Sequence, residues 1–368
     1  MKIAYVTINV ASKIMNGGVG AKIKRQISLW KEMGHSVKIF VLTPEIISFP
    51  DSEQFVFKPL VETIFLKFLT QEISRSQTLA RMISAVKGYQ PDIVYLRFGL
   101  YTFPLHTLFR IAPVLMEVNS NDLNEYRTRG PFYYWLNRFT RGIEFSLSSG
   151  LVPVSEELAD LNMRYGNPIC VVSNGINLDA YTPLPAPKNH TPVLTVIGSP
   201  GMGWHGVDKL FSLARQFPDL TLHIVGYRKD DFSEAIPPNL SVHGYLGQNE
   251  IREILANTDV VFGTLALHRK QMDENPALKV REALAYGIPV IIAHKDADLV
   301  GLNSPCFLFL PNTEDNVVSH ADAIRDFAYN SMGRRVEREL ISPRIDQRLK
   351  EEARLVFFQK ILEASKNK

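Results

Sequence analysis

Two glutamates enclose a short segment that has the sequence features of a helix beginning at an anion-binding end. Residues 274–282 read Glu-Asn-Pro-Ala-Leu-Lys-Val-Arg-Glu. Asn275 is a favourable N-cap, the proline after it suits the first helical position, and Gly287 is a favourable residue at a helix end. A helix is therefore predicted over 276–286.

The start of this helix is a candidate site for a phosphate or a diphosphate. The first backbone N–H groups, those of Ala277, Leu278 and Lys279, have no acceptor within a helix, and the Lys279 ammonium adds positive charge. Glu274 and Glu282 are poor ligands for a phosphate. They are expected to accept hydrogen bonds from hydroxyl groups on either side of it, with a sugar at Glu274 and a ribose at Glu282. The alternative is that both are solvated surface carboxylates.

Apolar runs typical of strands alternate with helical stretches along the chain. The first series lies at 3–8, 36–42, 92–96, 114–118, 150–154 and 169–172, and the second at 192–197, 221–225, 240–243, 260–262, 289–293 and 306–310. Short β-rich runs separated by helices favour parallel sheets with right-handed crossovers, so two doubly wound α/β domains are predicted. In such sheets ligands bind beyond the carboxyl ends of the strands, and functional residues are therefore expected in the loops there.

Proline positions indicate where the two series are joined and where the last helix begins. Prolines at 183, 185 and 187 predict a stiff linker over 181–190. Ser342 and Pro343 interrupt a helical pattern, and a charged amphipathic helix is predicted over 344–368. The apolar side of this helix is expected to carry Leu349, Ala353, Val356, Phe357 and Ile361.

The composition limits the class of protein. The chain has 368 residues, of which 45% are hydrophobic and 21% charged, and its net charge is +3. These values indicate a two-domain globular protein and argue against nucleic acid as a partner. Cys170 and Cys306 lie far apart with no metal-ligand spacing, which favours a reducing, cytoplasmic setting. The apolar run 3–10 resembles a short signal peptide, but Thr7 and Asn9 within it favour a buried first strand.

Several short motifs, taken in their order and spacing, resemble those of the retaining glycosyltransferases of family four. Residues 274–282 match the E-x7-E pattern of that family, and Ala-Tyr-Gly-Ile-Pro-Val-Ile at 285–291 resembles its A-x-G-x-P-V-I motif. Similar runs are Gly-Gly-Val-Gly at 17–20, Gly-His-Ser-Val at 34–37, Pro-Asp-Ile-Val at 91–94, Pro-Val-Ser at 153–155 and Val-Ser-Asn-Gly-Ile-Asn at 172–177. The resemblance extends over nearly the whole chain.

This resemblance implies the α/β GT-B fold. Two doubly wound Rossmann-like domains would face a central cleft, and the final helix would cross back to the N-terminal domain. Residues 1–180 together with 344–368 would form the N-terminal, acceptor-binding domain. Residues 181–343 would form the C-terminal domain, which binds the nucleotide-sugar.

The resemblance also implies which loops hold the donor diphosphate. Backbone N–H groups of Gly17 and Gly18 are expected to approach it, because glycine lets a backbone come close to a ligand. In relatives an arginine and a lysine contact the diphosphate at positions that here are Ser199 and His205. Since a histidine is mostly neutral at pH 7, either His205 donates a hydrogen bond or that role falls to Lys279 and the backbone.

Contacts to the base, the ribose and the acceptor are assigned to other loops by the same resemblance. Tyr227 follows a strand of the second series, and relatives hold the base largely through the backbone at the position of His243 and Gly244. Asn119 stands where relatives usually carry a histidine, and it is expected to hydrogen-bond a sugar hydroxyl. Arg97 follows a strand of the first series and is expected either to point into the cleft or to be a surface arginine.

The predicted activity is transfer of a sugar from a nucleotide-diphosphate-sugar to a hydroxyl group of a glycan or lipid-linked glycan, with retention of configuration as the resemblance implies. Glu274, Asn119 and Arg97 are the candidate catalytic residues. Neither a metal ion nor another cofactor is expected, and the D-x-D match at 296–298 is attributed to chance. Two alternatives stay open, namely a nucleotide-sugar epimerase of the same fold and a non-catalytic sugar-nucleotide-binding partner of another transferase. Such relatives usually assemble bacterial cell-surface polysaccharide.

An aromatic and basic segment has two interpretations. Residues 132–135 read Phe-Tyr-Tyr-Trp, and arginines stand at positions 127, 129, 138 and 141. Such a segment either contacts an anionic membrane surface or an acceptor lipid, or forms a buried aromatic helix. The buried helix is the expectation, while peripheral contact with the inner membrane surface stays open.

Overall fold

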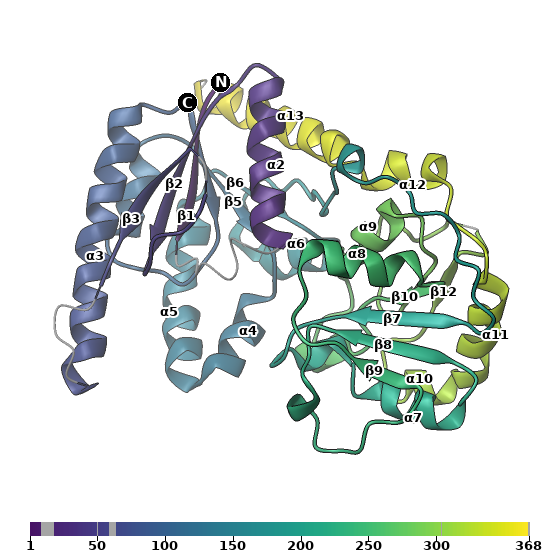
Figure 1. Cartoon of the computed structure of the whole chain (residues 1–368). Coiled ribbons are helices and arrows are strands. Elements are labelled where there is room, and N and C mark those ends of the chain that lie inside the picture. Colours follow the sequence, from purple (N-terminus) through teal and green to yellow (C-terminus); the bar gives the residue numbers. More distant parts are fainter. Residues whose placement is uncertain (9–17, 50, 59–63, 303, 367–368) are drawn as a thin grey trace. The chain divides into compact units, whose positions relative to one another are not determined.

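The chain folds into two compact units (Figure 1), which a computed structural model describes for residues 1–8, 18–49, 51–58, 64–302 and 304–366, with the backbone alone for 64–69. The first unit comprises Met1–Ser173 and Arg348–Lys368, and the second comprises Asn174–Gln347. Within the described residues, each unit contains one six-stranded sheet. The predicted α/β class with two doubly wound domains is confirmed.

The sheet of the first unit is parallel throughout and has the order β3-β2-β1-β4-β5-β6. This is the doubly wound order of Rossmann-like folds. Its central strands are near-continuous apolar runs because helices cover both faces. The strands are β1 (Lys2–Ile8), β2 (Ser36–Thr43), β3 (Ser52–Val56), β4 (Ile93–Arg97), β5 (Val114–Val118) and β6 (Gly150–Pro153).

Two groups of helices cover the faces of this sheet. Helices α2 (Gly18–Glu32) and α13 (Gln347–Lys366) pack against the side chains of one face, which include Tyr5 and Tyr95. Helix α3 (Ile64–Tyr89), helix α5 (Pro131–Leu147) and the 3-10 turn η1 (Leu105–Arg110) cover the other face. The shorter helices α4 (Asp122–Arg129) and α6 (Glu156–Asn162) follow β5 and β6.

The sheet of the second unit repeats this winding, with the order β12-β11-β10-β7-β8-β9. Its strands are β7 (Val193–Ile197), β8 (Thr221–Val225), β9 (Leu240–Val242), β10 (Val260–Phe262), β11 (Val290–Ile292) and β12 (Phe307–Phe309). One face is covered by α7 (Lys209–Gln216), α10 (Asn316–Ser319) and α11 (Ala321–Ser331), and the other by α8 (Gln248–Ala256), α9 (Leu278–Ala285) and α12 (Arg338–Ile345). All the strands predicted for the second series are present.

The first sheet differs from the prediction at its two edges. Strand β3 is absent from the predicted series because its sequence, Ser-Glu-Gln-Phe-Val, lacks an apolar run, and all its residues are only half-buried. The predicted strand 169–172 is reduced to a single bridge between Leu151 and Ile169. An edge strand buries less side-chain surface, so the hydrophobic signal of β3 is weak.

The final helix packs on the first unit, as predicted. Its residues Leu355, Phe357, Phe358 and Ile361 are buried in the core of that unit. The predicted apolar side is wrong for Leu349 and Val356, which are 45% and 51% exposed, and for Ala353, which is also exposed. The buried side instead includes Glu351, which accepts hydrogen bonds from Trp30 Nε1 (2.9 Å) and Gln26 Nε2 (3.1 Å). Amphipathic periodicity missed this face because it mixes apolar and charged residues.

The second unit begins earlier and ends later than the predicted domain. The Ile176 amide donates to the Ile345 carbonyl (2.8 Å), and the Gln347 amide to the Ile176 carbonyl (3.0 Å). These bonds connect the segment before residue 181 to the end of α12. Pro343 lies inside α12. Among the described helices, none combines the length and the apolar composition that a membrane span requires.

Candidate functional site

In the second unit, the loops that follow β7 and β8 lie in direct contact. Gly226 has φ +93°, and a Cβ there would stand 2.1 Å from the Gly198 carbonyl oxygen. A side chain at Gly226 is therefore excluded both by conformation and by space. The Gly226 amide donates to the Gly244 carbonyl (2.7 Å), and the Gly244 amide to the Tyr227 carbonyl (2.8 Å). The carboxyl ends of β7, β8 and β9 thus form one connected group of loops.

The loop after β7 holds His205 in a defined orientation. The Ser199 amide donates to His205 Nδ1 (3.1 Å), and the Tyr227 hydroxyl donates to the Ser199 carbonyl (2.7 Å). A Cβ on Gly198 would stand 2.8 Å from His205 Nδ1, so only glycine allows this approach. Because Nδ1 accepts, the ring proton of the neutral imidazole belongs on Nε2.

His205 is a neutral donor and not a cation. Its burial, together with the charges of Lys279 and Lys270, lowers the pKa of His205 to about 3. This geometry is consistent with the predicted alternative in which His205 donates a hydrogen bond, here through Nε2. Lys279 lies close enough to His205 for its charge to disfavour the protonated ring.

Helix α9 begins at Leu278, later than the predicted start at 276. The predicted N-cap, Asn275, is wrong because Ala277 occupies that position with an extended conformation. The Asn275 amide donates to the Lys295 carbonyl (3.0 Å), which holds Asn275 next to β11 instead. The Ala277 amide donates to the Asn275 carbonyl (3.0 Å), so of the three predicted anion-binding amides only those of Leu278 and Lys279 open the helix.

Lys279 reaches from the start of α9 to the end of β7. Its Nζ donates to the Ile197 carbonyl at 3.2 Å, beside the Gly198 loop. Burial lowers the pKa of Lys279 to about 7. The ammonium is therefore only partly protonated near neutral pH, and a neighbouring anion would raise its pKa by stabilising the charged form.

The two glutamates of the 274–282 segment are not solvated surface groups. Glu274 is 3% exposed and pairs through its backbone with Lys295 next to β11. Glu282 is half-buried on α9, and burial raises the pKa of its carboxyl group. Its charge acts on Tyr181 and Tyr286, whose rings meet edge to face. The two carboxylates thus occupy different surroundings on either side of the start of α9.

Arg281 fixes the start of α9, and the sequence analysis did not identify it. The fully buried guanidinium contacts Asp296 (2.7 and 2.8 Å) and Asp298 (2.7 Å). It also donates to the Asn174 carbonyl (3.0 Å), while Asn174 Nδ2 donates to the Pro276 carbonyl (2.9 Å). The two aspartates of the D-x-D match at 296–298 therefore bind Arg281. In the described part of the chain, no three His, Cys, Asp or Glu side chains gather as a metal ion would require.

The residues expected at the base are partly occupied by other contacts. His243 Nε2 lies 2.7 Å from His223 Nδ1, and burial lowers the pKa of both rings. The Gly244 amide and carbonyl are both used in the loop contacts described above. Tyr227 is buried, and its hydroxyl is held by Ser199. These residues support the loops around His205 more directly than they present free polar groups.

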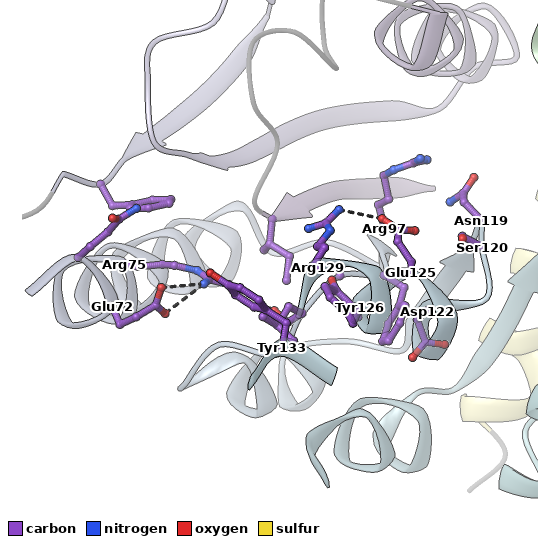
Figure 2. Close-up of a pocket in the computed structure, with 16 residues that line it drawn as sticks. Glu72, Arg75, Arg97, Asn119, Ser120, Asp122, Glu125, Tyr126, Arg129 and Tyr133 are labelled. Carbon is purple, nitrogen blue, oxygen red and sulfur yellow. Dashed lines mark hydrogen bonds and ion pairs between the residues drawn. The ribbon is translucent and has the colours of Figure 1, made fainter. Parts of the chain in front are cut away.

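In the first unit, a cavity of about 600 Å³ lies at the carboxyl ends of β4 and β5 (Figure 2). Arg97 and Asn119, both predicted site residues, line it on one side. Arg75 lines the opposite side, where it pairs with Glu72 (3.1 Å). Aromatic side chains complete the wall together with polar ones, so the cavity suits a ligand that carries hydroxyl groups on a carbon framework.

A buried carboxylate orients the predicted residues of this cavity. Glu117, on β5, is fully buried and contacts Arg97 (2.7 Å) and Lys22 (2.8 Å). Although burial raises the pKa of Glu117, the charges of Lys22 and Arg97 hold it well below the ordinary value. Lys22 also donates to Asn119 Oδ1 (3.3 Å). Arg97 and Asn119 are thus tied to one ionic group, which the sequence analysis missed because Lys22 and Glu117 are distant in sequence.

The predicted site residues therefore fall into two groups, one in each unit. Arg97 and Asn119 belong to the first unit, and the residues around His205 and α9 to the second. Gly18 is the first residue of α2 and is exposed. Gly17 lies outside the described residues.

Two family models match the sequence. The model described as Glycosyltransferase Family 4 matches residues 16–180, and the model described as Glycosyl transferases group 1 matches residues 194–329. Each match covers most of one unit. No curated protein sequence matches the chain significantly.

Solved structures resemble the fold over nearly the whole chain. A glycosyltransferase from Rickettsia africae has a TM-score of 0.64 at 14% identity, with 98% of this chain and 99% of that chain covered. The lipopolysaccharide outer core galactosyltransferase WaaB has a TM-score of 0.65 at 16% identity, with 99% and 100% covered. HepE from Anabaena, in complex with UDP-glucose, has a TM-score of 0.63 at 14% identity, with 99% and 100% covered.

Proposed function

The chain is a glycosyltransferase of the GT-B fold, and on that premise we propose that it transfers a sugar from a nucleoside-diphosphate-sugar to a hydroxyl acceptor, with retention of configuration. The observation that carries the donor assignment is the meeting of Lys279, His205 and the start of α9 at the end of β7. The 274–282 segment adds the E-x7-E pattern of family four. In this proposal residues 181–343 contain the donor site.

The donor site stabilises the charge that develops on the leaving diphosphate. Backbone amides of Leu278 and Lys279, the Lys279 ammonium and His205 Nε2–H all donate to anions. Their positions are set in advance, because Arg281 anchors α9 and Ser199 anchors His205. Donors fixed before the reaction favour the transition state, in which the diphosphate is more negative than in the bound substrate.

The two glutamates distinguish the parts of the donor on either side of the diphosphate. Glu282, inside the helix, accepts from the ribose, and Glu274, before the helix, accepts from the sugar. Tyr227, His243 and Gly244 border the base. The assignment of Gly17 and Gly18 to the diphosphate rests on the family resemblance alone. Asp296 and Asp298 are engaged by Arg281, so this pair does not offer a metal site, and the proposed reaction uses neither a metal ion nor a further cofactor.

The acceptor is a glycan or lipid-linked glycan that binds in the first unit, at the cavity of Arg97 and Asn119. Its hydroxyl-rich chemistry matches a wall that contains both ionic and aromatic side chains. Since WaaB is a lipopolysaccharide core galactosyltransferase and HepE binds UDP-glucose, a UDP-sugar and cell-surface polysaccharide are the first donor and product class to examine.

Donor turnover tests this function. The purified protein is incubated with UDP-, GDP- and ADP-sugars, with and without EDTA, and released nucleoside diphosphate is measured by chromatography. Release from one donor class, unchanged by EDTA and increased by a glycan acceptor, is the expected result. The Lys279→Ala variant should no longer release nucleoside diphosphate, whereas Lys229→Ala, at an exposed position in the same unit, should release it as the unchanged protein does. Binding without release would contradict a transferase, and an epimerised nucleotide-sugar without acceptor would indicate the epimerase.

A further inference from the structure

Helix α5 presents its apolar residues outward and its polar residues inward. The outward residues are between 40% and 75% exposed and recur three or four positions apart, so they form one stripe along the helix. They are Phe132, Trp135, Phe139, Ile143 and Leu147. The buried side of the same helix carries Asn137, Arg141 and Glu144 beside Phe145. A surface helix of a globular protein normally has the opposite arrangement. The expectation of a buried aromatic helix is therefore wrong.

This orientation of α5 is fixed by its buried side. Arg141 contacts Asp122 through two hydrogen bonds (2.7 and 2.8 Å) and Asn162 through a third (2.9 Å). Asn137 Nδ2 donates to Asp122 (2.6 Å). Rotating the helix to bury the stripe would break these buried ionic contacts, which is costly. The outward stripe is thus a stable property of the first unit.

Arginines and aromatic rings with polar edges flank the stripe near the start of α5. Arg127 lies over the Tyr134 ring (5.1 Å) and Arg138 over the Trp135 ring (6.0 Å), and both arginines are exposed. Tryptophan and tyrosine prefer the boundary between apolar and aqueous phases, and arginine is attracted to anionic headgroups. A long apolar stripe with a basic flank matches a helix that lies in the plane of a lipid surface.

We propose that this stripe, together with Arg127 and Arg138, binds the first unit to an anionic lipid bilayer. The apolar side chains would enter the boundary between headgroups and acyl chains, and the two arginines would contact anionic headgroups. Tyr133, in the same turn as Phe132, lines the cavity of Figure 2. The bilayer would therefore lie beside the cavity. Uptake of a lipid-linked acceptor from this surface into the cavity rests on the proposed function. Binding of the stripe to the bilayer does not.

Vesicle co-sedimentation tests the binding without any sugar transfer. The full-length protein should sediment with vesicles of phosphatidylcholine and phosphatidylglycerol and much less with phosphatidylcholine alone, and added salt should weaken the binding. Trp135 should report insertion by a blue-shifted emission. Of the other two tryptophans, Trp30 is fully buried and Trp204 belongs to the second unit, so neither is expected to enter the lipid. Loss of two inserted side chains in Trp135→Ser/Phe139→Ser should lower the partition coefficient by about tenfold or more.

Matched variants separate the stripe from general surface effects. Leu349→Ser/Val356→Ser removes two exposed apolar side chains of α13 and should bind as the unchanged protein does. Arg127→Gln/Arg138→Gln should lose roughly tenfold in binding to anionic vesicles, whereas Lys188→Gln/Lys229→Gln, both exposed in the second unit, should lose little.

Three results would overturn the proposal. The first is an absence of binding to anionic vesicles by a folded protein. The second is equal binding by the stripe variant and its α13 control. The third is a dimer in light scattering that the Trp135→Ser/Phe139→Ser variant abolishes, with no vesicle binding, since a second copy of the chain would then cover the stripe. Donor turnover by the same preparations, measured without lipid, shows separately whether the proposed function holds.

Discussion

Binding of a nucleoside diphosphate should take up a proton through Lys279. Burial lowers the pKa of this lysine to about 7 in the free protein, whereas an ordinary lysine titrates near 10.4. A diphosphate next to Nζ stabilises the ammonium, so the bound pKa moves up towards the ordinary range. Affinity should therefore be highest below pH 7 and should fall as the pH rises above 7, where the free lysine is neutral.

The size of the effect follows from the two pKa values. The protonated fraction of free Lys279 falls from about one half at pH 7 to roughly one hundredth at pH 9, so the dissociation constant should rise about 50-fold over that interval. At pH 8 binding should take up nearly one proton per site. His205 does not contribute in this range, because its pKa is about 3. The diphosphate is also fully ionised there, since its last ionisation lies near pH 6.

Isothermal titration calorimetry measures this directly. Titrations of UDP, or of the diphosphate of whichever donor turns over, are repeated at pH 8 in buffers of different ionisation enthalpy, and the slope gives the proton uptake. Lys279→Met should bind more weakly and without proton uptake. Lys279→Arg keeps the charge at every pH, because arginine stays protonated, so its affinity should not depend on pH. Equal proton uptake by the unchanged protein and Lys279→Met would refute the placement of Nζ on the diphosphate.

The remaining predictions concern the carboxylates and the two buried anchors. Glu282→Ala should weaken binding of the free nucleoside diphosphate by about 1–3 kcal/mol in calorimetry, and an unchanged affinity would remove Glu282 from the ribose. Glu274→Ala should leave the affinity for the free nucleoside diphosphate unchanged and reduce turnover of the nucleotide-sugar. An equal loss of affinity and of turnover would show that Glu274 and Glu282 do not bind different parts of the donor. Arg281→Ala leaves buried carboxylates unpaired and should lower the free energy of unfolding in urea by about 3–5 kcal/mol. Phe358→Ala should cost a similar amount, because its ring packs on Trp30 (5.4 Å), and a loss below about 1 kcal/mol would contradict the docking of α13.

The sequence predicted most of the sheet because these strands are buried on both faces. A strand such as β10, Val260–Phe262, is fully buried and has to be an apolar run, and such runs are visible without any knowledge of the fold. Strand β3 was not predicted, because an edge strand buries little side-chain surface and the polar residues of β3 give no apolar run. Gly287 was correctly identified as the residue after the α9 helix, where φ is +80°.

The rest depended on contacts between distant residues. The α9 start was predicted from local capping rules, but pairing of Asn275 with Lys295 overrides them. Lys22 and Glu117 form an ionic pair that only the folded sheet brings together. For α5, the aromatic residues were expected to be buried, and the sequence could not show that the polar side faces the core, because a buried Arg141 requires Asp122 as its partner.

The place of α13 in the chain has a consequence for the order of folding during synthesis. The core of the first unit needs Leu355, Phe358 and Ile361 against Trp30 and Tyr95, yet these residues leave the ribosome after the whole second unit. At about 5–20 residues per second, the N-terminal part would wait roughly 10–40 seconds for its last helix. In that interval the face around Trp30 stays uncovered, while the second unit already has all its strands. The usual order, in which the N-terminal domain is completed first, is therefore reversed, and the nascent first unit is the part that a chaperone would have to protect.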